Sequence, residues 1–230
     1  MIRVMVGIPT AEMARRAAFY DYYHTLELPV GTSCTFIHGQ SIANNRNLIV
    51  KQALISGCSH VFFLDDDTAF KPNTLVQLLS HNKDIVTGLH LMRNYPHRPI
   101  IFDEIDEKGV CRFHYLSDNE DGLIPIEAAG LGACLIKTKV FSKLEEPWFR
   151  LGEIDKDGMG EDLGFFKRVK EIGLKSYCDL TCLIGHMSNT IVWPSRKDGI
   201  WLTNYETSGE AVISFPQTTA KQVREELAKI

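Results

Sequence analysis

The sequence predicts an α/β fold in which a mainly parallel, Rossmann-like sheet is flanked by helices. Short β-rich runs alternate with helical patterns in the first third of the chain, and this alternation is typical of a parallel sheet with helical crossovers. The chain has 230 residues, of which 44% are hydrophobic and 23% charged, ordinary values for a soluble globular protein with a sizeable core. No internal repeat or linker interrupts the pattern, so one domain is expected.

The first part of the chain is expected to contain three strand-to-helix units. Strands are predicted at residues 3–8, 30–38, 60–64 and 84–91. The helices between them are predicted at residues 11–26, 41–57 and 71–82. Ser41 is a suitable N-cap, Gly57 a suitable stop, and Pro72 suits a first helical turn.

The second part of the chain has a different pattern. Turn residues between short strands over 93–123 predict hairpins at one edge of the sheet. An apolar strand with a glycine-rich entry and an amphipathic helix ended by Gly173 follow, and two short strands then lead to His186. The domain is expected to cover residues 1–205, and a C-terminal tail with a short charged helix is expected at 206–230.

Composition and charge exclude several classes of protein. The net charge of −4, without a basic stripe, argues against nucleic-acid binding. No apolar run approaches the roughly 20 residues that a transmembrane helix needs. Six cysteines without a CxxC pair indicate reduced thiols, and the chain opens without a signal peptide's long apolar core. A cytoplasmic protein is therefore expected.

Three aspartates directly follow the apolar run "HVFFL" of residues 60–64. Side chains two apart in a strand point the same way, so Asp65 and Asp67 can share one face while Asp66 points elsewhere. Ligands of open parallel sheets bind beyond the carboxyl ends of the strands. Two carboxylates at that edge would suit a hard divalent ion, Mg²⁺ or Mn²⁺. The alternative is a solvated turn in which Asp67 or Thr68 only caps the next helix.

The segment "ANNRNLIVKQALISGCSHVFFLDDD" resembles the sequence that leads into the DxD motif of GT-A-fold glycosyltransferases, particularly those of the large family 2 type. The resemblance implies that Asp65 contacts the base or ribose of a nucleotide and that Asp66 lies near the ribose. It implies that Asp67 ligates the metal that bridges the two phosphates of a nucleotide sugar. It covers roughly residues 1–190.

Other parts of the chain match this family on weaker patterns. Arg46 matches a basic residue that faces the nucleotide, although a solvated surface arginine is an equal alternative. Pro9 and Thr10 match the nucleotide-binding edge at the tip of the first strand. Gly130 and Gly132 resemble the glycine-containing strand that lines the donor-sugar pocket, and core packing is the alternative explanation.

Two further positions complete the expected site. Glu161 and Asp162 begin a helix, where the helix dipole favours an ionised carboxylate. The pair resembles the family's ED motif, which implies that Asp162 is the catalytic base and that Glu161 holds the acceptor or a neighbouring backbone group. Capping of the helix is the alternative role. His186 resembles the histidine that completes the metal shell, and the alternative is a structural histidine.

Together these resemblances imply a metal-dependent glycosyltransferase. It would move a sugar from a nucleotide diphosphate sugar to the hydroxyl of a carbohydrate, lipid or protein acceptor, with inversion and with Mn²⁺ or Mg²⁺. The family's frequent use of UDP-sugars implies UDP. A retaining enzyme of the same fold and a nucleotide-sugar-binding module without activity are the alternatives. A nucleotidyltransferase is disfavoured because "VGIPTAEMARR" lacks a glycine-rich phosphate loop. A haloacid-dehalogenase-like phosphatase is disfavoured because Ala69 breaks the expected DxDxT/V pattern.

Overall fold

The structure is a computed structural model that describes residues 2–10, 17–106, 110–152, 160–206 and 213–219, with residues 222 and 225. The strands of its main sheet are β1 (Val4–Thr10), β2 (Ser33–His38), β3 (His60–Leu64), β4 (Thr68–Ala69), β5 (Ile85–His90), β8 (Leu123–Ile126), β10 (Ala133–Lys137), β11 (Ser176–Met187), β12 (Ile191–Lys197), β13 (Ile200–Glu206) and β14 (Ile213–Pro216). A small second sheet contains β6 (Ile101–Ile105), β7 (Cys111–Phe113) and β9 (Ala128–Ala129). The helices are α1 (Ala17–Tyr23), α2 (Ile42–Ile55), α3 (Thr74–Ser80), α4 (Thr138–Phe141) and α5 (Glu161–Glu171).

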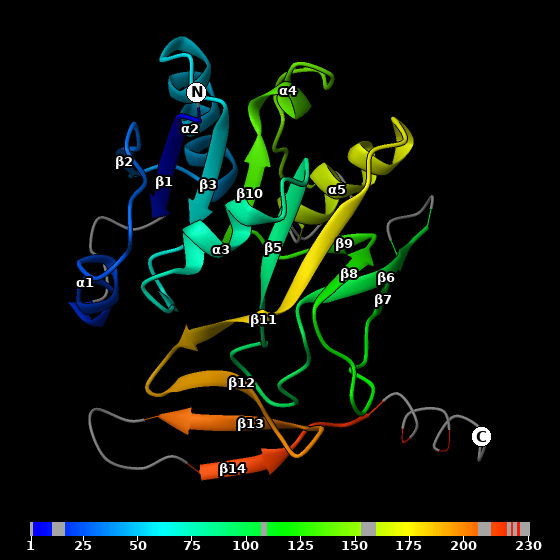
Figure 1. The fold of residues 1–230 in the computed structure, drawn as a ribbon. Coiled ribbons are helices and arrows are strands. Elements are labelled where there is room, and N and C mark those ends of the chain that lie inside the picture. Colours follow the sequence, from blue (N-terminus) through cyan, green and yellow to red (C-terminus); the bar gives the residue numbers. More distant parts are fainter. Residues whose placement is uncertain are drawn as a thin grey trace.

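The strand order of the main sheet confirms an α/β architecture (Figure 1). The order is β14-β13-β12-β11-β5-β10-β3-β1-β2, and β4 and β8 both pair with β11. β1 pairs in parallel with β2 and β3, and β11 pairs in parallel with β5. β10 lies antiparallel between β3 and β5, and β12 to β14 are also antiparallel. The expected parallel direction therefore holds for the strands of the crossover units but not for β10 or the C-terminal strands.

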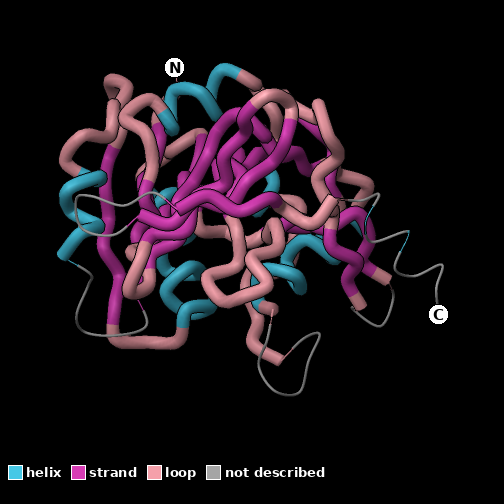
Figure 2. The backbone as a smooth tube through the Cα atoms, turned by 90° about the horizontal axis from the view of Figure 1, so that it is seen from below, coloured by secondary structure: helices cyan, strands magenta, loops and turns pink. Residues whose placement is uncertain are grey.

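The central strands are apolar on both faces because two cores cover them. Val61 and Phe63 of β3 belong to the core that includes buried side chains of α2, α4 and α5. Phe62 and Leu64, which point the other way, belong to the core that includes side chains of α1 and α3. Figure 2 accordingly shows helices on both sides of the strands. The carboxyl ends of β3 and β5 thus lie at one edge of a sheet that is packed on both faces.

Local signals set both ends of α2 and the end of α5 as predicted. The side chain of Ser41 accepts a hydrogen bond from the backbone N–H of Asn44 and caps α2. Gly57 and Gly173 follow α2 and α5 with positive φ angles of 63° and 72°, which favour glycine. The prediction for Pro72 is wrong in detail, because α3 begins at Thr74 with Asn73 at its N-cap.

The region before and after His186 differs from the prediction. Instead of two short strands, β11 is one strand of 12 residues, with an irregularity between Asp179 and Leu183. β14, which lies within the expected tail, pairs with β13 and extends the main sheet. Of the hairpins expected within 93–123 at one edge of the sheet, the structure has the antiparallel pair β6 and β7, but this pair belongs to the small second sheet and not to an edge of the main sheet. Residues 11–16 of the first expected helix, and most of the expected C-terminal helix, lie outside the described residues.

Among the described residues, no helix combines the length and apolar character needed to cross a membrane.

Candidate functional site

A cavity of about 260 Å³ lies at the carboxyl edge of β3 and β5. Its wall includes eight of the eleven residues predicted for the site: Arg46, Asp65, Asp67, Gly130, Gly132, Glu161, Asp162 and His186. They come from α2, the turn after β3, the entry to β10, the start of α5 and the end of β11. The antiparallel direction of β10 matters here, because it brings the start of that strand to the same edge.

The turn after β3 brings Asp67 to His186. The backbone N–H and the hydroxyl of Thr68 both donate to the carbonyl of Asp65, at 3.2 and 2.6 Å, so the chain reverses there. β4 then pairs antiparallel with β11, with Thr68 opposite His186. As a result, Oδ2 of Asp67 lies 3.4 Å from Nε2 of His186.

The hydrogen bonding of His186 leaves one ring nitrogen available. Nδ1 lies 2.8 Å from the carbonyl oxygen of Leu91, and a carbonyl can only accept, so Nδ1 carries the proton. In a neutral ring, Nε2 then presents its lone pair toward Asp67, the arrangement that orients a metal-ligating histidine. In the described part of the chain, no group of three or more His, Cys, Asp or Glu side chains is placed to hold a metal. The carboxylate oxygen of Asp67 and the ring nitrogen of His186, 3.4 Å apart, are both atoms that can ligate a divalent ion.

Arg46 links two of the predicted carboxylates. Its Nη2 lies 2.9 and 3.0 Å from the carboxylate oxygens of Asp65, and its Nη1 is paired with Glu161. Burial by itself would lower the pKa of Arg46, but the carboxylates of Asp65, Glu161 and Asp162 raise it overall. Arg46 is only 3% exposed. Although it lines the cavity, its guanidinium is engaged on both sides, so it orients Asp65 and Glu161 and is not a free surface arginine.

Asp162 has the electrostatic character of a base. Burial raises its pKa to about 6, and the neighbouring Glu161 carboxylate adds to the effect. The backbone N–H of Leu163 donates to Oδ1 of Asp162 at 2.8 Å, which fixes the carboxylate at the first turn of α5. A carboxylate with a pKa near 6 is ionised at neutral pH and is a stronger base than an ordinary aspartate.

The two glycines lie against the cavity and a buried histidine. A Cβ atom on Gly130 would lie 2.9 Å from Nε2 of His90, a contact too short to accept. A Cβ atom on Gly132 would lie 3.3 Å from Cγ2 of Thr68 and 3.5 Å from Oδ2 of Asp65. The packing explanation therefore applies to Gly130, while Gly132 also leaves space beside Asp65.

Sequence reasoning missed His90 and Arg93, which also line the cavity. His90 ends β5 and is 4% exposed, and burial, with the nearby His186, lowers its pKa to about 3. It is therefore neutral at physiological pH. Its position at the carboxyl end of a predicted strand was a signal that could have found it.

Pro9, Thr10 and Asp66 do not line this cavity. The hydroxyl of Thr10 donates to Oδ2 of Asp66 at 2.5 Å. The carbonyl of Thr10 accepts from Nδ2 of Asn45 at 2.8 Å. These bonds join the ends of β1 and β3 to α2. Pro9 pairs with Ile37 of β2, so the structure engages these three residues in contacts between β1 and its neighbours and not in the cavity wall.

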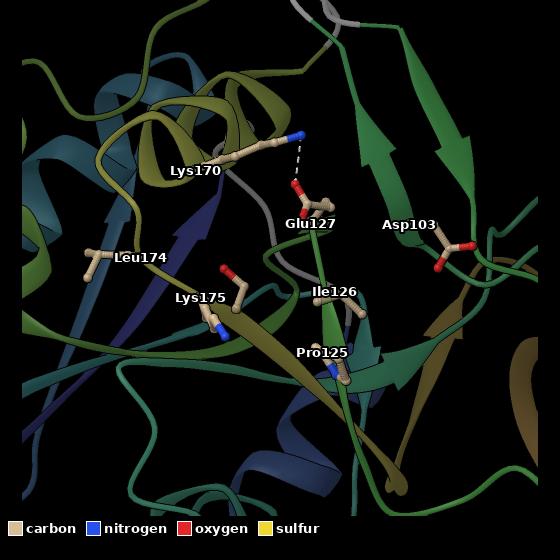
Figure 3. A pocket seen from close by; sticks show the side chains of 8 residues that line it. Asp103, Pro125, Ile126, Glu127, Lys170, Leu174 and Lys175 are labelled. Atoms are coloured by element: carbon tan, nitrogen blue, oxygen red, sulfur yellow. Dashed lines mark ion pairs between the residues drawn. The ribbon is translucent and has the colours of Figure 1, made fainter.

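A larger cavity, of about 380 Å³, lies near the end of α5 and the start of β11 (Figure 3). Lys170 of α5 pairs with Glu127 at 2.9 Å, and its Nζ also donates to the carbonyl of Ile105 at 3.1 Å. Asp103 and Leu174 lie on opposite sides of the hollow in Figure 3. The charged groups of this wall do not converge on one point, so we assign the functional site to the smaller cavity.

Comparisons with known proteins add evidence on the fold. No protein-family model matches the chain, and no curated protein matches its sequence. Among solved structures, the chain is similar to the crystal structure of A197 from STIV, with a TM-score of 0.62 and 17% sequence identity. The similarity covers 92% of this chain and 98% of A197. At this identity it supports a shared α/β fold over nearly the whole chain.

Proposed function

We propose that this protein is a GT-A-type glycosyltransferase that moves a sugar from a nucleotide diphosphate sugar to an acceptor hydroxyl, using Mn²⁺ or Mg²⁺. The observation that carries the proposal is the convergence of three distant segments on one cavity. These are the aspartate turn with Asp67, the start of α5 with Asp162, and the end of β11 with His186. A solvated acidic turn after β3 would explain the first segment but not the other two.

The proposed roles follow from the chemistry of each group. Asp67 and His186 would hold the divalent ion, which when bound neutralises charge on the departing diphosphate. Asp65, oriented by Arg46, would contact the nucleoside. Asp162 would accept the proton of the acceptor hydroxyl while the oxygen of that hydroxyl bonds to the anomeric carbon of the sugar. The bond from that carbon to the diphosphate oxygen breaks, and the nucleoside diphosphate leaves.

Inversion of the anomeric configuration is the outcome that this arrangement favours. In an inverting reaction the acceptor attacks opposite the leaving group and needs a base, which Asp162 would supply. UDP is proposed as the nucleotide because the family that the sequence resembles frequently uses it.

A thermal-shift experiment with nucleoside diphosphates tests the proposal. A ligand that binds the folded state raises the apparent melting temperature through linkage. We expect UDP with Mn²⁺ to raise the melting temperature by several degrees, and UDP without a divalent ion to raise it much less. The same samples are then assayed for sugar transfer from UDP-sugars to candidate acceptors.

The matched variants are Asp67→Asn and Asp118→Asn, which both exchange a carboxylate for an amide. In D67N the metal-dependent shift should disappear and the transfer rate should fall by at least about 100-fold. Asp118 lies outside the cavity wall, so D118N should keep both the shift and the rate. Absence of any metal-dependent shift with every nucleoside diphosphate would contradict the proposal. A full shift without transfer to any acceptor would favour a binding module.

A further inference from the structure

Arg93 is a second cation of the cavity, and it differs from Arg46 in its exposure to solvent. It lies in the irregular segment after β5 and lines the cavity. Its Nη1 lies 3.2 Å from Oδ2 of Asp67. The side chain of Arg93 is 38% exposed, whereas that of Arg46 is 4% exposed. A half-exposed guanidinium can leave its partner at far lower cost than a buried one.

The carboxylate oxygen that Arg93 contacts is also the one nearest His186. Oδ2 of Asp67 lies 3.4 Å from Nε2 of His186 and 3.2 Å from Nη1 of Arg93. A divalent ion held by Asp67 and His186 would bring two positive charges close to this guanidinium. Because like charges at such distances repel strongly in a partly buried site, both cations do not share that oxygen.

We propose that Arg93 and a divalent cation compete for Asp67, and that Arg93, once displaced, binds the diphosphate of the donor. This inference rests on the proposed function and adds a residue to it. The guanidinium is suited to the second role because its planar fork forms paired, charge-assisted hydrogen bonds with phosphate oxygens. Arg46 is not available for this role, since Asp65 and Glu161 already engage it.

The competition predicts effects of opposite sign for two ligands. Without Arg93, the competition of its guanidinium for Asp67 is removed, so Mn²⁺ alone should bind more tightly. With Mn²⁺ bound, a diphosphate loses the hydrogen bonds of the guanidinium and should bind more weakly. A residue that only supports the fold would weaken both kinds of binding together.

The experiment compares Arg93→Gln with the unaltered protein. Binding of Mn²⁺ alone is measured by the loss of the free-ion electron paramagnetic resonance signal, and binding of inorganic pyrophosphate at saturating Mn²⁺ is measured by calorimetry. We expect R93Q to bind Mn²⁺ about 3- to 10-fold more tightly and pyrophosphate about 10- to 100-fold more weakly. Arg93→Lys keeps the charge without the fork, so it should keep most of the competition and lose part of the pyrophosphate affinity.

Arg98→Gln is the control, because Arg98 lies over the ring of Phe113 at 5.3 Å and is outside the cavity wall. It should leave both affinities unchanged. Unchanged binding of Mn²⁺ or of pyrophosphate in R93Q, with normal binding by the unaltered protein, would overturn this inference alone. If the unaltered protein binds neither probe, the proposed function and the inference both fail.

Discussion

At the scale of single residues, the cavity holds carboxylates in different electrostatic states. Burial raises the pKa of Asp65, while its ion pair with Arg46 opposes that effect. For Asp162, burial together with Glu161 raises the pKa to about 6, although the charge of Arg46 opposes the effect. In the unfolded chain an aspartate titrates near 3.9. Between about pH 4 and pH 6 the folded protein therefore binds more protons, so Asp162 lowers the free energy of unfolding as the pH rises through that range.

Replacing Asp162 with Asn should separate stability from activity. At pH 7.5 we expect D162N to raise the free energy of unfolding by about 1 to 2 kcal/mol, because it removes a buried charge but keeps an oxygen for the N–H of Leu163. We expect the transfer rate to fall by about 10²- to 10⁴-fold. Urea unfolding and initial rates are the measurements. In the unaltered protein kcat/KM should rise with pH through about 6, and a rate that is flat from pH 5 to 7 would favour a retaining mechanism without this base.

At the scale of elements, the irregularity in β11 decides which residue meets Asp67. Asp179 pairs with Gly88, yet Leu183 already pairs with Leu89, the next residue of β5. The buried carboxylate of Asp179 holds this irregularity. It accepts from the N–H and hydroxyl of Thr181 at 2.8 and 2.6 Å, and from Nε2 of Gln77 in α3 at 2.9 Å. The extra residues shift the register of β11, and His186 then lies opposite Thr68.

Replacing Asp179 with Ala should disturb the cavity from a distance. The change leaves the N–H of Thr181 and Nε2 of His81 without their partner and removes one of the two acceptors of Gln77, which should cost about 2 to 4 kcal/mol of the free energy of unfolding. Mn²⁺ affinity should fall as well, because His186 loses its register. Urea unfolding and Mn²⁺ titration check both effects.

The control is Asp84→Ala. Asp84 pairs with Lys137 and Lys139, and its replacement should lower the free energy of unfolding by less than about 1 kcal/mol. A stability loss in D179A with unchanged Mn²⁺ affinity would refute the register argument.

At the scale of the whole molecule, the C-terminal strands belong to the same sheet as the cavity. β12, β13 and β14 continue antiparallel from β11, as Figure 1 shows. Trp201 of β13 is 1% exposed and belongs to the core that also contains side chains of α2 and α5. The backbone N–H of Gln217 donates to the carbonyl of Trp201 at 2.9 Å. The segment beyond residue 205 therefore contributes to the packed fold.

A chain that ends at Glu206 tests this contribution. It lacks β14, which exposes the edge of β13 and removes the partner of the Trp201 carbonyl. If the loss is about 2 kcal/mol, the melting temperature should fall by about 4 to 8 °C in a chain of this size. An unpaired edge strand should also increase aggregation. Calorimetry and light scattering measure the two effects. An unchanged melting temperature would show that the fold ends where the expected tail begins.

The sequence by itself determined the features that depend on neighbours along the chain. Ser41, Gly57 and Gly173 set helix ends through local hydrogen bonds and backbone conformation. The apolar run before Asp65 predicted a buried strand with carboxylates at its end, and the acidic pair before Leu163 predicted a helix start.

Only the tertiary structure decided the features that depend on partners far away in the chain. An apolar strand is stable in either direction, so the sequence did not reveal that β10 is antiparallel. The pairing of Arg46 with Glu161 joins residues 115 positions apart, and no local pattern encodes it. The same reason explains why Arg93 was missed: its role is set by the position of Asp67, which the turn after β3 and the register of β11 together determine.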